Sequence, residues 1–322
     1  MASSKSKKSV RLSDAAAEHD VVERAQKGLD RGKSASTAAG EFVREEIEHV
    51  REGKHGARSA KQAIAIGLSK ARRAGVPLGT PAEVIAQNAA TLAVLSGERF
   101  TLGLGSGENL NEHVVGAGWP PPRARQAMLS EAVDIIEQLW TGEELSHEGE
   151  FFEVDRAQLW DVPKTPPRLA IAAGGSKAAE LAGKKGAGLF ATEAKAPLVE
   201  AWRKAGGRRA RYAEVAISYA KSEEEAVRVA HERFSFGLLG WKVLPELPTP
   251  KSFEGALAHV KPQDVAESIT CGPDPERHVQ AVRKYIEAGF DHLVLVGVGP
   301  DQHGFLRFWK EELAPRLRKL ST

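Results

Sequence analysis

The chain has 322 residues, of which 42% are hydrophobic and 27% charged, with a net charge of +2, so it is long enough to bury a sizeable core in one large or two smaller domains. Its apolar runs are far shorter than the roughly 20 residues of a membrane helix, and the N-terminus lacks the apolar stretch of a signal peptide, so we expect a cytoplasmic protein with no membrane segment. Cys271 is the single cysteine, which excludes an internal disulfide and a thiolate metal cluster, and we expect no metal site.

The N-terminal part of the chain is basic and predicted to be helical. Residues 1–79 hold 16 Lys+Arg and 10 Asp+Glu, whereas residues 80–322 hold 29 and 33. The first 13 residues are small, polar and basic, which is typical of a disordered tail, and 1–31 as a whole form a disordered or helical basic tail. Further on, Phe42, Val43, Ile47 and Val50 recur at helical spacing. A solvated helical extension and an arm that binds nucleic acid through 1–79 both stay open.

The stretch 32–76, GKSASTAAGEFVREEIEHVREGKHGARSAKQAIAIGLSKARRAGV, resembles a small bacterial family of uncharacterised, basic, histone-like proteins. The resemblance implies no established chemistry. It supports a separate helical segment over 32–79, followed by a second domain over 80–322.

From Pro77 onward, predicted strands alternate with helices, which is typical of a parallel α/β sheet or barrel. The five strand candidates span 99–105, 169–173, 188–191, 214–219 and 292–297. The predicted helices span 81–95, 124–140, 177–185, 223–236, 275–288 and 302–319. A hairpin over 144–154 interrupts this order, and the aperiodic, proline-containing stretch 237–260 predicts a long excursion over one face of the domain.

The most informative motif is TLGLGSGENLNEH, residues 101–113. An apolar strand ends in small residues and then delivers Glu108, Asn111, Glu112 and His113 at its carboxyl end, where a (β/α)8 barrel places its active site. The glycines leave room for a flat ring, and Glu108 could exchange a proton with a bound heterocycle if burial raised its pKa. Glycine-rich strand ends also occur for turn geometry alone, so both interpretations stand.

Two later strand ends carry similar signals. LAIAAGGSK, residues 169–177, is a strand followed by glycines and a helix start, which predicts either an anion site or an ordinary tight turn. GLFATEAK, residues 188–195, presents Thr192, Glu193 and Lys195, and Lys195 is either a partner for an acidic substrate group or a solvated loop lysine. His147, His231, His259, His278 and His303 show no metal-ligand spacing and are expected at the surface.

These motifs together resemble a known family. The segments 86–120, 128–142, IAAGGS, GAGLFAT and the ending HLVLVGVGPDQHGFLRFWKEELAPRLRKL are similar to the F420-dependent luciferase-like oxidoreductases, and most of all to their glucose-6-phosphate dehydrogenase subgroup. The likeness runs from about Thr80 to Leu320. It implies a TIM barrel and hydride transfer between a substrate carbon and the deazaflavin coenzyme F420.

The resemblance also implies roles for single residues. Glu108 matches the acid that manages the proton at the coenzyme ring, and Lys195 matches one of the lysines that hold the sugar phosphate. The second such lysine is absent from this sequence, and its place falls near Gly255. The matches to positions that line the coenzyme are Ser106, Gly107, Asn111, Ala173, Gly174, Gly175 and Thr192.

The N-terminal part departs from the family pattern. Family members begin with three strand–helix units that supply a histidine, a tryptophan and a strained peptide bulge beside the coenzyme, and none of these is identified before Thr80. We therefore predict a partial barrel of about five of the eight strands, lacking its first three units and preceded by a helical basic segment. A homodimer or the N-terminal helices would cover the open edge.

Besides a recombined or degenerate gene whose product folds poorly, three functional outcomes follow from the sequence. The first is an F420-dependent oxidoreductase of small-molecule substrates, either active or inactivated by the missing part of the barrel. The second is a non-enzymatic fusion in which the basic arm binds nucleic acid or a partner. The third is a luciferase-like monooxygenase that uses FMN instead of F420.

Overall fold

The computed structural model describes residues 19–31, 35–51, 82–112 and 119–320. The predicted tail over 1–13, most of the histone-like stretch and the transition near Thr80 lie outside these residues. Within the described ranges, no helix is long and apolar enough to cross a membrane.

Two N-terminal helices pack on each other, as the helical pattern predicts. They are α1 (His19–Asp30) and α2 (Ala35–Arg51), and they share a small core of Val21, Val22, Ala25, Ala38, Ala39 and Phe42. Glu45 and Glu46 are buried, although acidic residues of this stretch would be expected on the outer surface. Arg24 of α1 binds Glu41 of α2 at 3.2 Å, on the exposed side of the pair.

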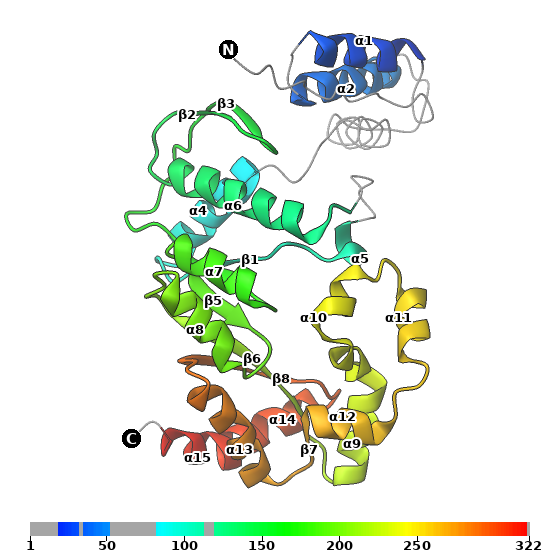
Figure 1. Cartoon of the computed structure of the whole chain (residues 1–322), viewed down its shortest axis with the longest axis vertical. Coiled ribbons are helices and arrows are strands. Elements are labelled where there is room, and N and C mark those ends of the chain that lie inside the picture. Colours follow the sequence, from blue (N-terminus) through cyan, green and yellow to red (C-terminus); the bar gives the residue numbers. More distant parts are fainter. Residues whose placement is uncertain (1–18, 32–34, 52–81, 113–118, 321–322) are drawn as a thin grey trace.

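The second part is an α/β structure built around a parallel sheet (Figure 1). Its strands are β1 (Thr101–Leu104), β4 (Arg168–Ala172), β5 (Gly188–Ala191), β6 (Arg211–Ser218), β7 (Thr270–Cys271) and β8 (His292–Gly297). The five predicted strands are all present. β7 was missed because two residues show no alternation, so the described sheet has six strands rather than five.

The helices follow the strands largely as predicted. They are α4 (Ala82–Leu95), α5 (Asn109–Glu112), α6 (Pro122–Leu139), α7 (Ser176–Lys184), α8 (Ala196–Lys204), α9 (Glu223–Phe234), α12 (Pro262–Ser268), α13 (Pro275–Glu287), α14 (Gln302–Phe308) and α15 (Ala314–Arg318), the last two joined by the π-helical turn η5 (Trp309–Leu313). The hairpin is β2 (Leu145–Glu148) and β3 (Glu153–Ala157). The predicted excursion is helical in short pieces, namely η3 (Ser235–Leu239), α10 (Gly240–Val243), η4 (Leu244–Glu246) and α11 (Pro250–Leu257).

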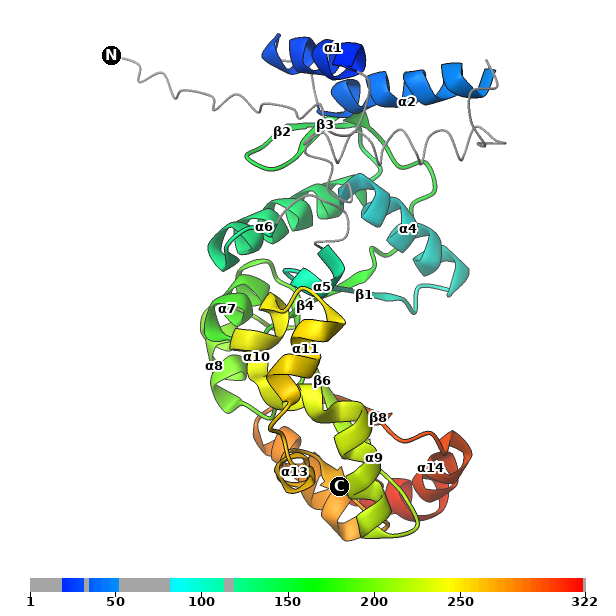
Figure 2. The same ribbon diagram turned by 90° about the vertical axis from the view of Figure 1, so that its right-hand side faces the viewer.

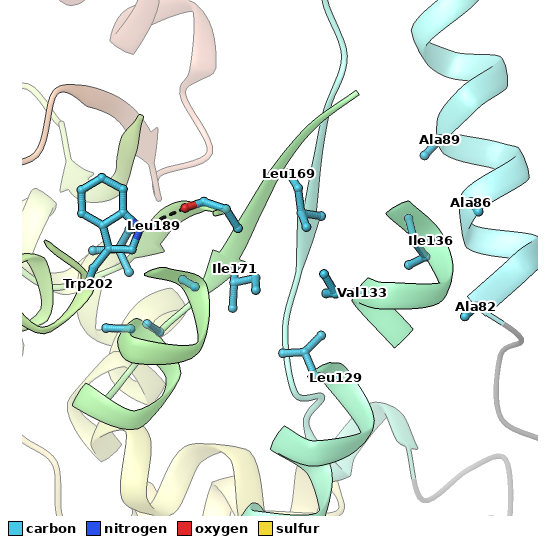
Figure 3. Packing of buried hydrophobic residues seen from close by; sticks show 14 of the residues in the cluster. Ala82, Ala86, Ala89, Leu129, Val133, Ile136, Leu169, Ile171, Leu189 and Trp202 are labelled. Atoms are coloured by element: carbon cyan, nitrogen blue, oxygen red, sulfur yellow. Dashed lines mark hydrogen bonds between the residues drawn. The ribbon is translucent and has the colours of Figure 1, made fainter. Parts of the chain in front are cut away.

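The main core lies between the outer face of the sheet and the helices α4, α6, α7 and α8 (Figure 3). A stripe of alanines on α4 faces α6, where the small side chains let the two helices approach closely. Two buried indoles also bind backbone carbonyls: Trp140 Nε1 donates to Ala86 at 3.0 Å and Trp202 Nε1 to Ala187 at 2.9 Å. These bonds satisfy polar groups that burial would otherwise penalise.

Strand β6 carries the C-terminal half of the sheet. The amides of Leu189 and Gly272 donate to the carbonyls of Ala210 and Ser218, whereas the amides of Asp291 and Val298 donate to Arg211 and Ile217. Because carbonyls of a strand point alternately to its two sides, β5 and β7 share one edge of β6 and β8 occupies the other. Direct pairing of β8 with β6 moves β7 out of the place between them that a regular barrel would give it.

The sheet does not close within the described residues. β1 pairs there only with β4, and β8 only with β6. The face opposite the main core is open, since Gly103, Ala172 and His292 on it are exposed and Val294 retains 51% of its surface. An open edge and an uncovered inner face were expected from the sequence.

Candidate functional site at the carboxyl ends of β1, β4 and β5

The predicted site residues follow three neighbouring strands and meet at one edge of the sheet. β1 and β4 pair in parallel with Leu104 opposite Ile171, and β4 pairs with β5 so that Ala172 faces Phe190. A side chain built on Gly105 would reach Ala172 at 3.5 Å. The loops that carry Ser106, Gly174 and Thr192 therefore leave three neighbouring strands at the same edge of the sheet.

The turn after β1 requires a glycine. Gly107 has φ of +81°, a left-handed conformation, and a Cβ there would lie 3.1 Å from Glu112 Oε1. The next residue, Glu108, is half-buried, and its carbonyl accepts the amides of Asn111 and Glu112, each at 3.0 Å, to start α5. Asn111 lies in that short helix and is exposed.

The turn after β4 leads into α7 without a side-chain cap. Gly175 is the N-cap residue in extended conformation, and nothing lies within 4 Å of its Cβ direction. Its carbonyl accepts from Ala178 and Ala179, both at 3.2 Å. An uncapped first turn leaves backbone N–H groups free to bind an anion from outside.

The turn after β5 is fixed by contacts from distant parts of the chain. The Thr192 carbonyl accepts from Tyr285 Oη at 3.2 Å, and its hydroxyl accepts from Trp241 Nε1 at 3.1 Å. Burial and the nearby carboxylates of Glu193 and Glu214 raise the pKa of Tyr285. The phenol therefore stays protonated at neutral pH and donates its hydrogen bond to the Thr192 carbonyl.

Lys195 is exposed and pairs with Glu193. The distance between Nζ and Glu193 Oε2 is 2.8 Å, so the charge of the ammonium is balanced within its own loop. Lys195 also begins α8 as its N-cap residue. An anionic substrate would have to compete with Glu193 for this lysine.

Four residues near the site were not singled out from the sequence. Trp119, Arg125 and Glu246 form a cluster, and Trp241 covers part of the β4 and β5 ends. Trp119, Trp241 and Glu246 lie in or beside stretches without clear periodicity. In these stretches, only the tryptophans could have pointed to a site from the sequence. The histidine expectation also needs correction, because His278 is fully buried.

Comparisons with known proteins place the chain in a family. Residues 74–292 match the model of the luciferase-like monooxygenase family. An F420-dependent glucose-6-phosphate dehydrogenase of Kribbella flavida is 35% identical, over 94% of this chain and 95% of its own, and one of Mycolicibacterium gilvum is 32% identical over 94% and 95%.

A solved structure supports the same placement. An F420-dependent secondary alcohol dehydrogenase in complex with an F420-acetone adduct matches with 25% identity and a TM-score of 0.67, over 73% of this chain and 75% of that one. The family match covers more than half of the chain. This chain belongs to the luciferase-like monooxygenase family.

Proposed function

We propose that this protein is an oxidoreductase that binds coenzyme F420 at the carboxyl ends of β1, β4 and β5. The observation that carries the proposal is that β1, β4 and β5 are neighbours in one parallel sheet, so the loops with Ser106, Gly174 and Thr192 leave it at one edge. We choose F420 rather than FMN because the two glucose-6-phosphate dehydrogenases named above are F420-dependent and align over 94% of this chain.

The local geometry fits a flat ring with an anionic tail. Gly105 and Gly107 keep side chains away from the end of β1, and the open position at Gly175 exposes the uncapped start of α7. A phosphate of the coenzyme tail would bind the N–H groups of that first turn. When bound, F420 supplies a carbon that accepts or donates a hydride.

The residues of this chain then have separate tasks. Glu108, half-buried beside the glycine turn, holds or moves the proton at the coenzyme ring. Asn111 and Thr192 orient the coenzyme, and Lys195 binds an acidic group of the substrate after leaving Glu193. The substrate is a small molecule, and the missing lysine near Gly255 argues against a second cationic contact to a sugar phosphate.

A titration with F420, and in parallel with FMN, tests the proposal through ligand fluorescence. We expect saturable binding of F420 at micromolar concentrations and weaker binding of FMN. Thr192→Val should weaken F420 binding, while Glu180→Gln, on the exposed face of α7, should leave it unchanged. Absence of F420 binding by a protein that melts cooperatively would refute the proposal.

The proposed role of Glu108 has its own test. Glu108→Gln should retain F420 binding and lose turnover by roughly 10²- to 10⁴-fold, the usual effect of removing a positioned acid or base. The measurement is single-turnover reduction of F420 with any substrate that a screen identifies. Full turnover in this variant, beside a normal Glu180→Gln control, would exclude the role.

A further inference from the structure

Trp241 occupies the space directly over two of the proposed coenzyme residues. A Cβ built on Gly174 would lie 2.4 Å from Trp241 Cγ and 2.7 Å from its Cβ, so the root of the indole touches the Gly174 backbone. The indole Nε1 donates to Thr192 Oγ1 at 3.1 Å. While Trp241 holds this position, a ligand cannot occupy the space that Gly174 leaves at its Cβ direction, or take the place of the indole on the Thr192 hydroxyl.

The segment that carries Trp241 is attached to the site by polar contacts at its far end. Glu246 accepts from Trp119 Nε1 at 2.6 Å and from Arg125 Nη2 at 2.8 Å, and its carbonyl accepts from Asn109 Nδ2 at 3.0 Å. The Arg125 guanidinium lies 3.7 Å from the centre of the Trp119 ring, which adds a cation–π contact. This group, called here the Glu246 latch, ties η4 to the residues after β1.

Apart from these contacts and from Leu238, which packs against the buried cluster around Val265, the segment has little anchoring in the core. Of residues 235–257, all of which the structure describes, only Ser235 and Pro245 are buried. It consists of short helical pieces, with Gly240 at φ of +62° between two of them. Both views place α10 beside α5 (Figure 1, Figure 2). A segment with few buried apolar contacts opens at lower free energy than the packed core.

We propose that residues 235–257 form a lid, in which Trp241 fills the coenzyme's place at Gly174 and Thr192 and leaves it when F420 binds. The Glu246 latch holds the closed lid. This inference rests on the proposed function, since it takes Gly174 and Thr192 as coenzyme contacts. A site that is closed most of the time binds with an affinity reduced by the fraction of open molecules.

The first test removes the occupying side chain. Stopped-flow and equilibrium titrations with F420 are made on the full chain, on Trp241→Ala and on Lys242→Ala, an exposed neighbour in α10 that serves as control. We expect Trp241→Ala to bind F420 faster and about tenfold more tightly, as for release of a state populated at one in ten. Weaker or unchanged binding by Trp241→Ala would overturn the lid and make Trp241 a wall of the site.

The second test needs no ligand. Glu246→Gln removes the charge that Arg125 binds. Acrylamide quenching of tryptophan fluorescence is measured on this variant and on the double variant that also carries Trp241→Phe. The difference between the two proteins gives the quenching of Trp241 alone, and the same pair is made in the wild-type background. We expect the Trp241 emission to be quenched more strongly than in the wild-type pair. Equal quenching would overturn the latch. Failure of every variant and of the wild type to bind F420 would overturn the proposed function, whereas F420 binding that ignores Trp241 overturns the lid alone.

Discussion

His278 shows how a single buried side chain makes the fold sensitive to acid. Its ring is fully buried, its Nε2 binds the Gly272 carbonyl at 2.9 Å, and its Nδ1 has no hydrogen-bond partner in the described part of the chain. The ring also packs edge-on against Phe308, with centroids 5.2 Å apart. Burial, assisted by the charge of Arg277, lowers the pKa of His278 against the opposing effects of the Gly272 bond and Asp274.

This shift predicts a pH dependence of stability. An unfolded histidine has a pKa of about 6.5, so the folded protein binds fewer protons than the unfolded chain below that pH. The contribution of His278 is therefore complete above about pH 6.5 and is lost as the pH falls through its lower folded pKa. We expect His278→Gln to flatten the decrease of melting temperature between about pH 7 and 5. His303→Gln, on an exposed residue, should keep the wild-type slope, and an unchanged slope in His278→Gln would contradict the assignment.

At the scale of elements, the close packing of α7 on α8 depends on Gly183. A Cβ at this position would lie 2.4 Å from the Trp202 carbonyl oxygen and 2.8 Å from Ala205 Cβ. Trp202 is itself fixed, because it is buried and bonded to the start of β5. The absence of a side chain at Gly183 therefore lets α7 and α8, which precede and follow β5, pack closely on each other.

The Gly183→Ala variant tests this packing. Overfilling a tight contact costs roughly 1 to 3 kcal/mol, so we expect a lower free energy of unfolding in urea. The matched control is Gly255→Ala in α11, where nothing lies within 4 Å of the added methyl group and alanine favours the helix by up to about 1 kcal/mol. Equal stability of the two variants would show that α7 and α8 can separate without cost.

The elements were easier to predict than the contacts between them. The strands β1, β4 and β5 were predicted because each is a short apolar run ending in small residues, whereas Thr270 and Cys271 are too few to form a pattern. α8 was missed because Pro197 stands near its start in a stretch taken as a loop. Trp241 meets Gly174 across 67 positions of sequence, and no local signal encodes such a contact. The placement of Glu108 after β1 followed from the motif, while its role stays a prediction.

At the scale of the whole molecule, the outermost strand β8 presents apolar surface at an edge without a second partner among the described strands. Val294 on β8 keeps 51% of its surface exposed. A free edge with exposed apolar side chains favours pairing with another chain. We expect the protein to self-associate with rising concentration, as the predicted homodimer would.

Light scattering over a concentration series measures this association. Val294→Lys should reduce it, because a lysine on an edge strand opposes pairing, while circular dichroism stays unchanged. Gln263→Lys adds the same single positive charge at an exposed position of α12 and is the control. A Val294→Lys protein that associates like the wild type would place the contact elsewhere.

The order of strand pairing has a mechanical consequence. In a closed ring of strands, any two are connected by two routes, and the loss of one link leaves the ring joined. The described sheet is open and branches at β6, which pairs with β5, β7 and β8, and every route from β1 to β8 passes through β6. Damage to that one strand would separate β1, β4 and β5 from both β7 and β8, so the integrity of the described sheet depends on β6.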